Sequence, residues 1–366
     1  GAFEEGDNYS YWANSVDYYL ADEAGTAGRK TERNLNKLFE GTADYAGQWG
    51  GHSLTTVLGT SYQNFMTDKS EMSNGGYASD ATKYFRIGEG DASKTKMNIS
   101  SERSSNTLIS FFGRANYNYL EKYLLSASVR REGSSRFGVN NKWGWFPAAS
   151  AGWRISSEDF MKPITWVNDL KLRFGFGVTG NDLASDLKSK QLLSGEGTMW
   201  YNGAWITTYS VAQNDNPDLK WEKKAEYNLG LDYVLLNNRL YGSIEVYKRF
   251  TSDLLWEYNV SCPPYQYPVL LSNAGKMESK GLEISVTGVP VKTKDFTWST
   301  TPTIAFNDNV ITNLSSPELG INYDALLTGA ISGNGLNSTN TQKMVEGRSV
   351  GSFYGYKWTG QYTSSG

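Results

Sequence analysis

The stretch "ASVRREGSSRFGVNNKWGWFPAASAGWRI", residues 127–155, decides the fold of this chain. Small or apolar residues alternate with polar ones where it begins, a charged and aromatic segment follows, and the alternation then resumes. Alternation with a period of two is typical of a β-strand that has two different faces. The stretch therefore predicts two strands that face each other across a connection rich in charged and aromatic residues.

The same alternation runs through most of the chain. In "KLRFGFGVTG", residues 171–180, Leu172, Phe174, Phe176 and Val178 share one face, while polar residues and glycines share the other. We predict strands at 30–45, 51–64, 105–119, 122–134, 145–156, 170–181, 219–236, 239–257, 276–289, 296–309 and 351–363. Most of them reach the length of about 9–11 residues that a membrane-crossing strand needs.

The predicted connections form two classes that alternate along the chain. Compact connections lie at 46–50, 120–121, 157–169, 237–238 and 290–295. Mostly long and polar connections lie at 65–104, 135–144, 182–218, 258–275 and 310–350. Outer-membrane barrels combine short periplasmic turns with longer extracellular loops, whereas a soluble domain rarely carries several such loops. The chain is therefore predicted to be all-β, a transmembrane antiparallel β-barrel.

Charged residues within the predicted strands avoid the apolar face. Those that lie opposite it are Arg114, Arg173, Asp232, Glu245 and Glu283. A basic residue facing lipid at the membrane midplane costs about 2–4 kcal/mol, so the polar face is predicted to line a wet interior. Arg131 and Lys248 share the apolar positions, but near the long-loop ends of their strands their side chains can reach the headgroups. A half-solvated soluble sheet is the alternative that this pattern leaves open.

Composition excludes several classes of protein. The net charge is -3 and the basic residues are scattered, which argues against nucleic acid as a partner. No apolar run approaches the roughly 18 residues of a transmembrane helix, although a mean hydropathy of -0.51 still allows barrel strands. The chain opens with "GAFEEGDNYS" and closes with "GQYTSSG" inside a predicted strand. We therefore expect it to be an excerpt of a larger protein.

Trp143, Trp145 and Phe146 lie where a predicted strand begins after a loop. Aromatic residues gather at both interfaces of a membrane barrel, so these three are predicted to be membrane-interface aromatics. An aromatic cluster beneath a soluble hairpin is the alternative, because amphipathic rings suit either place.

The sequence shows no pattern that indicates catalysis, a metal or a cofactor. "GFGVTG", residues 175–180, matches a dinucleotide-binding pattern, but no parallel strand follows it and its first glycines lie on the polar face of a strand. His52 and Cys262 are the single histidine and the single cysteine, so no Cys/His metal set or nucleophile pair can form. "NDNPD", residues 214–218, lacks the glycine and glutamate of an EF-hand loop and is predicted to be a turn. We predict that the chain is not an enzyme.

Two of the long loops are aromatic. "TMWYNGAW" contains Trp200, Tyr201 and Trp205, and "PPYQYP" contains Tyr265 and Tyr267. Aromatic faces can stack on sugar rings or pack around peptide side chains. We predict these five residues to be substrate-binding positions of extracellular loops. Packing of the loops on each other, or on a partner protein, is the alternative.

Five segments of the chain resemble the SusC/RagA family of TonB-dependent outer-membrane transporters of Bacteroidetes-type bacteria. They are "YLLSASVRREGSSRFGVNNKWGWFPAASAGWRISSEDFM", "VNDLKLRFGFGVTGN", "NPDLKWEKKAEYNLGLDYVLLNNRLYGSIEVYKRFTSDLL", "NAGKMESKGLEISV" and "EGRSVGSFYGYKWTG". The segments follow the family's order and cover most of residues 105–363, whereas residues 1–104 are less distinctive.

The resemblance implies a plugged barrel of about 22 strands, of which residues 1–366 supply about half as part of one TonB-dependent-receptor β-barrel domain. The plug, the TonB-contact segment and the carboxy-terminal strands are expected outside the chain. The implied function is active import of oligosaccharides or oligopeptides. The implied partners are TonB, a SusD-like surface lipoprotein that closes the barrel mouth, and outer-membrane lipid. A siderophore or cobalamin receptor and a passive porin or adhesin barrel are the alternatives.

Overall fold

The computed structural model describes residues 2–12, 25–90, 97–182, 186–317, 320, 325–333, 336–357 and 359–360. Contacts divide the chain into two compact units. The first unit comprises residues 1–41 and 60–110, and the second comprises residues 42–59 and 111–366. Regular structure in both is almost entirely antiparallel β-sheet.

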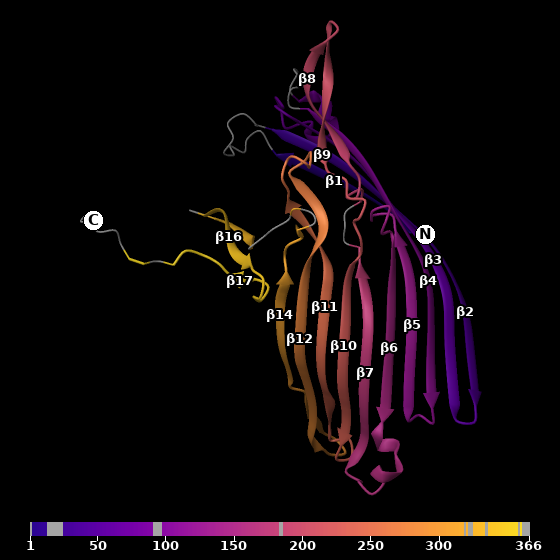
Figure 1. Ribbon diagram of the computed structural model, residues 1–366. Coiled ribbons are helices and arrows are strands. Elements are labelled where there is room, and N and C mark those ends of the chain that lie inside the picture. The colour runs from indigo at the N-terminus through magenta and orange to yellow at the C-terminus, as the bar shows by residue number, and fades with distance from the viewer. Residues whose placement is uncertain are drawn as a thin grey trace. The chain divides into compact units, whose positions relative to one another are not determined.

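The strands are long and follow one another closely along the chain (Figure 1). They are β1 (Ala2–Trp12), β2 (Thr26–Trp49), β3 (His52–Gly75), β4 (Asn98–Tyr119), β5 (Tyr123–Ser134), β6 (Trp143–Arg154), β7 (Val167–Asn181), β8 (Leu192–Tyr201), β9 (Ala204–Gln213), β10 (Glu222–Leu235), β11 (Leu240–Asn259), β12 (Val269–Lys292), β13 (Thr297–Thr300), β14 (Thr303–Asn313), β15 (Leu326–Gly333), β16 (Leu336–Met344) and β17 (Ser352–Phe353). Three short 3-10 helices are η1 (Lys83–Glu89), η2 (Ile155–Ser157) and η3 (Asp159–Met161).

Strands of the second unit pair mostly with their neighbours in sequence. The order is β4-β5-β6-β7-β10-β11-β12, and β12 then pairs with both β13 and β14. β8 and β9 form a separate two-stranded sheet, and β15, β16 and β17 form a three-stranded one. This is a meander of antiparallel hairpins, and it confirms the predicted alternation of short and long connections.

One row of cross-strand partners shows how the register sorts the two faces. The row runs through Leu125, Ala151, Phe174, Leu229, Val246, Leu282 and Phe306. The next row runs through Ser126, Ser150, Gly175, Asn228, Tyr247, Gly281 and Asn307. Because the side-chain period is two, each strand presents its apolar residues on one side and its small or polar residues on the other. We call these sides the apolar face and the polar face.

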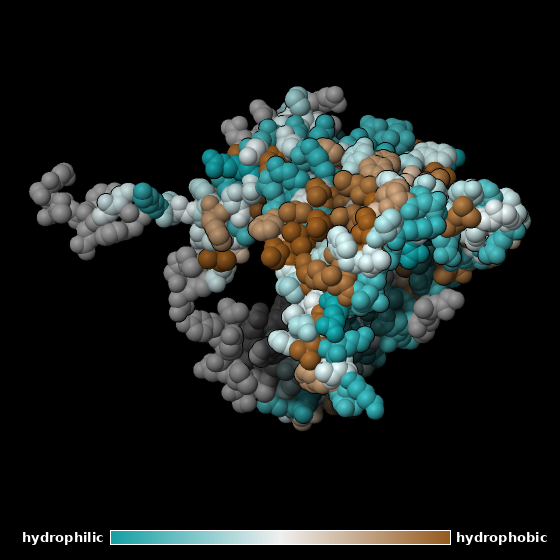
Figure 2. Space-filling model, turned by 90° about the horizontal axis from the view of Figure 1, so that it is seen from below, coloured by the Kyte–Doolittle hydropathy of each residue, from teal (hydrophilic) through white to brown (hydrophobic). Residues whose placement is uncertain are grey.

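The apolar face leaves large side chains uncovered. Leu125, Leu229 and Val246 are each about half exposed. Figure 2 shows residues of high hydropathy gathered into a patch rather than scattered among polar ones. A soluble monomer rarely exposes so much contiguous apolar surface, whereas lipid covers it without cost. The register therefore favours the membrane reading over a half-solvated soluble sheet.

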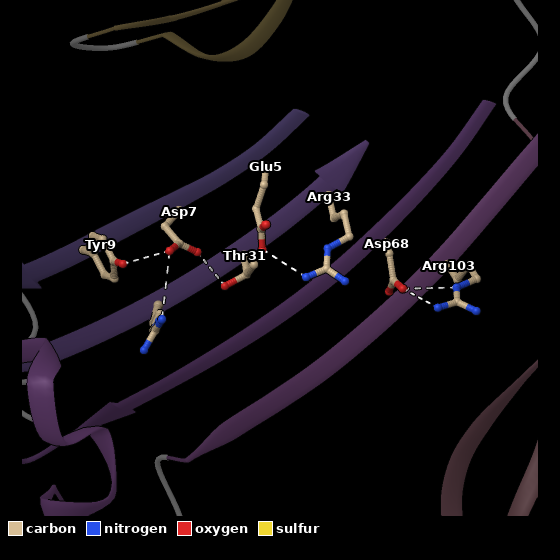
Figure 3. Close-up of polar contacts among 8 residues, drawn as sticks. Glu5, Asp7, Tyr9, Thr31, Arg33, Asp68 and Arg103 are labelled. Atoms are coloured by element: carbon tan, nitrogen blue, oxygen red, sulfur yellow. Dashed lines mark hydrogen bonds and ion pairs between the residues drawn. The ribbon is translucent and has the colours of Figure 1, made fainter. Parts of the chain in front are cut away.

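Strands of the first unit carry charges on both faces. β2 and β3 have 24 residues each, or about 80 Å of strand, far more than the roughly 9–11 residues that cross a bilayer. Figure 3 shows ion pairs with the strands on either side: Glu5 of β1 with Arg33 of β2 at 3.1 Å, and Asp68 of β3 with Arg103 of β4. Asp7 accepts hydrogen bonds from Tyr9 at 3.0 Å and Thr31 at 2.8 Å. Such a charged surface suits water rather than lipid.

The short connection between β2 and β3 depends on two glycines. Gly50 and Gly51 both have positive φ, at +51° and +86°. Positive φ at both central residues defines the type I′ turn, whose twist matches that of a two-residue hairpin. The predicted connection at 46–50 overlaps this turn only at Gly50, because β2 continues to Trp49.

Other boundaries differ from the sequence prediction. β1, the β8–β9 hairpin and the β15–β16 hairpin were expected to be loops or unassigned chain. β3 continues to Gly75 and β4 begins at Asn98, so both strands extend into the predicted 65–104 loop. Of the predicted strand 351–363, only Ser352–Phe353 is a strand among the described residues, and positions 358 and 361–366 lie outside them. No described helix is long and apolar enough to cross a membrane.

Candidate functional site

The polar face of the second unit carries a network of ion pairs. Arg173 of β7 donates to Asp232 of β10 at 2.7 and 2.8 Å and to Glu245 of β11 at 2.7 Å. Arg249 donates to Glu226 at 2.7 Å. These contacts confirm that the charges within the strands gather opposite the apolar face.

Two open concavities lie on the same polar face. Their volumes are about 430 and 450 Å³, and both are lined by serine, asparagine and charged side chains, including Ser126, Ser150 and Asn228. A face with this chemistry is readily hydrated, as the inner wall of a transport barrel must be.

The β8–β9 hairpin presents the aromatic residues predicted to bind substrate. Trp200 and Trp205 are cross-strand partners with their ring centroids 5.5 Å apart at an interplanar angle of 70°. They are 58% and 67% exposed, and Tyr201 beside them is exposed to a similar extent. Glu196 is the single charged residue from Leu192 to Gln213. Apart from Glu196, the hairpin is thus an uncharged aromatic surface that reaches into solvent.

A sequence feature that the prediction did not use explains this hairpin. Asn202 and Gly203 form its turn with φ of +47° and +82°. An Asn-Gly pair between strand-forming residues is the strongest short-range indication of a type I′ hairpin. The segment was instead assigned to a long loop, because its glycines and polar residues suggested irregular chain.

The second predicted aromatic pair lies on a different loop. Tyr265 and Tyr267 are half-buried in the connection between β11 and β12. Asn214, at the base of the hairpin, joins this loop to it: its side chain donates to the carbonyl oxygens of Tyr267 at 2.6 Å and Val269 at 3.0 Å. The same side chain accepts from the backbone N–H groups of Gln266 at 3.2 Å and Tyr267 at 3.0 Å. The structure therefore brings Tyr267 to the base of the hairpin, whereas Trp200 and Trp205 lie at its tip.

Two further asparagines continue this connection. Asn216 donates to the Leu271 carbonyl at 2.9 Å. Asn273 of β12 accepts from the Lys220 N–H at 2.9 Å and donates to the Lys220 carbonyl at 2.8 Å. We call Asn214, Asn216 and Asn273 the asparagine clamp. The "NDNPD" segment, predicted to be only a turn, thus ties the base of the aromatic hairpin to β12.

A small cavity of about 150 Å³ lies beside the clamp. It is lined by Lys188, Ala212, Gln213, Glu257, Tyr267, Val269 and Leu271. Lys188 and Glu257 form an ion pair of 2.8 Å across its wall. The cavity offers hydrogen-bonding groups and one aromatic ring, but its volume suits only a small part of a larger ligand.

The three predicted membrane-interface aromatics separate into two groups. Trp143 and Trp145 are exposed and lie on the apolar face. Phe146 is 8% exposed and packs edge-on against Trp221, with ring centroids 5.3 Å apart. Alternation along β6 places Phe146 on the opposite face, so the structure keeps only the two tryptophans together.

The described residues contain no group of three or more His, Cys, Asp or Glu side chains placed to hold a metal ion. Nδ1 of His52 lies 2.7 Å from the Tyr117 hydroxyl, and Cys262 is an exposed thiol in the β11–β12 loop.

Comparison with known proteins identifies the family. Residues 2–366 match the family model described as "TonB dependent receptor-like, beta-barrel". The chain is 36% identical over 255 residues to the TonB-dependent receptor SusC of Bacteroides thetaiotaomicron, covering 69% of this chain and 25% of SusC. It is 33% identical over 318 residues to the TonB-dependent receptor P39 of Formosa agariphila, covering 86% of this chain and 28% of that protein.

A solved structure of the RagAB peptide transporter shares the fold. Its TM-score is 0.77 at 25% identity, covering 89% of this chain and 35% of that chain. The chain thus spans about a quarter to a third of the length of these relatives. The likeness confirms the predicted all-β barrel wall, and the relatives, which are receptors and transporters rather than enzymes, confirm that this chain is not an enzyme. The chain belongs to the TonB-dependent receptor β-barrel family of the outer membrane and is similar to its SusC and RagA members.

Proposed function

We propose that the protein imports oligosaccharides or oligopeptides across the outer membrane, energised through TonB and closed by a SusD-like surface lipoprotein. The aromatic hairpin carries the proposal. Its exposed Trp200, Tyr201 and Trp205, with almost no charge around them, suit neutral sugar rings and apolar peptide side chains. SusC and the RagAB peptide transporter, both similar to this chain, support this class of cargo and a two-protein machine.

The asparagine clamp supports the same proposal. An isolated two-stranded hairpin is marginally stable in water, so an aromatic tip held out for cargo needs a fixed base. Asn214 supplies this base through four hydrogen bonds to backbone groups of residues 266–269. Asn216 adds one hydrogen bond to the Leu271 carbonyl of β12. Tyr267 is held at this base, which extends the proposed contact surface inward from the tip.

The first test is purification of the protein from outer membranes in detergent, followed by mass spectrometry of what accompanies it. A SusD-like lipoprotein in equal amount is the expected result, and retained cargo would identify the substrate class. Recovery of the protein alone, together with uptake that survives collapse of the proton gradient, would instead indicate a passive porin.

The second test addresses the hairpin itself. We expect the double variant Trp200→Ala/Trp205→Ala to weaken cargo binding about tenfold, because each lost aromatic contact is worth about 0.5–1.5 kcal/mol. Trp166→Ala is the matched control, because Trp166 is equally exposed but lies in the short connection before β7. Equal binding by both variants would remove the hairpin from the proposed site.

A further inference from the structure

Arg131 occupies an unusual position on the apolar face. It follows Leu125, Ala127 and Val129 on the same side of β5 and pairs across the sheet with Trp145 of β6. A basic side chain on a lipid-facing row is costly near the midplane and nearly free at the interface. Arg131 lies toward the long-loop end of β5, so its guanidinium is placed at the headgroup level of the outer leaflet.

Two tryptophans hold the guanidinium. Its central carbon lies 5.0 Å from the ring centroid of Trp143 and 5.3 Å from that of Trp145. Gly133 makes room for the Trp143 ring, since a Cβ there would lie 2.9 Å from it. On the other side, Phe111 of β4 stacks on Trp143 at 6.3 Å and 21°. The three rings form an aromatic floor beneath Arg131.

The charge of Arg131 is left for an outside partner. Within the described part of the chain it forms no ion pair, and its contacts are with the two indole rings. Arg130, the adjacent residue on the polar face, instead donates to both carboxylate oxygens of Glu132 at 2.9 Å. A guanidinium that rests on aromatic faces keeps its N–H edges free, and that fork matches the oxygens of a phosphate.

The neighbouring strands also carry charge on the apolar face toward their long-loop ends. Lys248 and Lys280 are cross-strand partners on the apolar face, and each is paired with a carboxylate, Glu278 at 2.9 Å and Asp308 at 3.5 Å. Closer to the short turns, the described apolar positions of β5, β6, β7, β10 and β11 carry no charged side chain. Charge on this face therefore lies toward the long-loop ends of the strands. Arg131, like Lys223 on the apolar face of β10, has no carboxylate partner within the described part of the sheet.

We propose that Arg131, supported by Trp143, Trp145 and Phe111, binds the phosphate of a phosphorylated lipid in the outer leaflet. The guanidinium donates to the phosphate oxygens, and the indole rings lie against the glycerol or sugar part of the headgroup and the first methylenes. The site would fix the rotation and depth of this part of the wall in the membrane. It is independent of the imported cargo, since it lies on the lipid side of the sheet.

The test is native mass spectrometry of the detergent-purified protein, titrated with lipid A that carries two phosphates and with its dephosphorylated form. We expect the phosphorylated lipid to bind the wild-type protein about tenfold more tightly, the size of effect of a charge-assisted hydrogen-bonded pair. Arg131→Gln should abolish most of that difference. Arg114→Gln is the matched control, because Arg114 is also exposed but lies on the polar face, and it should leave the difference intact.

Two results with the wild-type protein would overturn the proposal. One is equal affinity of the wild-type protein for both lipids, a comparison that needs no variant and so does not depend on folding. The other is displacement of the bound lipid by millimolar inorganic phosphate, which would make the site a general phosphate site rather than a lipid site. Loss of binding in Arg114→Gln equal to that in Arg131→Gln would also contradict the assignment to the apolar face.

Discussion

Replacing Asn214 by alanine tests how the aromatic hairpin is held. The Asn214 side chain is buried and takes part in four hydrogen bonds, all to backbone groups of residues 266–269. Each bond contributes a net of about 0.5–1.5 kcal/mol, and a buried backbone group left without a partner costs about 1–3 kcal/mol. Allowing for water that enters the space, we expect Asn214→Ala to destabilise this loop locally by about 2–4 kcal/mol.

Hydrogen exchange measures this loss directly, because Gln266 and Tyr267 donate their amide N–H groups to Asn214. A loss of about 2 kcal/mol in local opening free energy corresponds to about 30-fold faster exchange of these two amides. Strands far from the clamp should keep their protection. Asn307→Ala, an exposed asparagine on the polar face of β14, is the matched control and should change neither amide. Unchanged exchange at Gln266 and Tyr267 in Asn214→Ala would refute the clamp as the fixed base of the hairpin.

Three further predictions concern other parts of the second unit. Gly138→Ala should destabilise the loop between β5 and β6 by about 1–3 kcal/mol in denaturant unfolding, because its Cβ would lie 2.0 Å from the Pro217 carbonyl oxygen; wild-type stability would contradict the close approach. Leu229→Lys should cost about 2–4 kcal/mol of folding free energy in lipid vesicles, whereas Asn228→Lys should cost much less. Equal costs would contradict the assignment of these residues to a lipid-facing and a water-facing side. A hydrogen bond from Tyr123 holds the pKa of the Glu158 carboxyl below its usual 4.5. The stability that Glu158 gives to residues 155–161 is therefore present above pH 4.5 and is lost as the pH falls through the lowered pKa. Hydrogen-exchange protection of these residues that is the same at pH 7 and pH 3 would exclude this contribution.

Period-two alternation was enough to predict the faces of the barrel wall. Phe174 was assigned to the apolar face of its strand, and the structure pairs it directly with Leu229 of the neighbouring strand. The prediction succeeds because lipid favours apolar side chains and water favours polar ones. Consecutive residues of a strand face opposite sides, so the sequence of each strand indicates its two faces. Strand length was harder to predict. β2 carries charges at adjacent positions, with Arg29 beside Lys30 and Glu32 beside Arg33. The alternation ends there although the strand continues.

The candidate site was only partly predictable. Aromatic composition located the tip residues Trp200 and Trp205, and it also grouped Phe146 with Trp143 and Trp145. The structure separates Phe146 because a one-residue step along a strand reverses the face, and Trp221, distant in sequence, covers it. The asparagine clamp depends on loop segments about 50 residues apart, as between Asn214 and Tyr267, and no local pattern reports such contacts.

Import through the barrel and lipid binding at Arg131 both require lipid on one face of the sheet and water on the other. Spin labels on Leu229→Cys and Asn228→Cys test this placement most directly, in a Cys262→Ser background that removes the exposed native thiol. In membranes, the label at position 229 should collide mainly with oxygen, which concentrates in lipid, and the label at position 228 mainly with a water-soluble nickel chelate. Equal collision with the chelate at both positions, or the reverse pattern, would contradict the account.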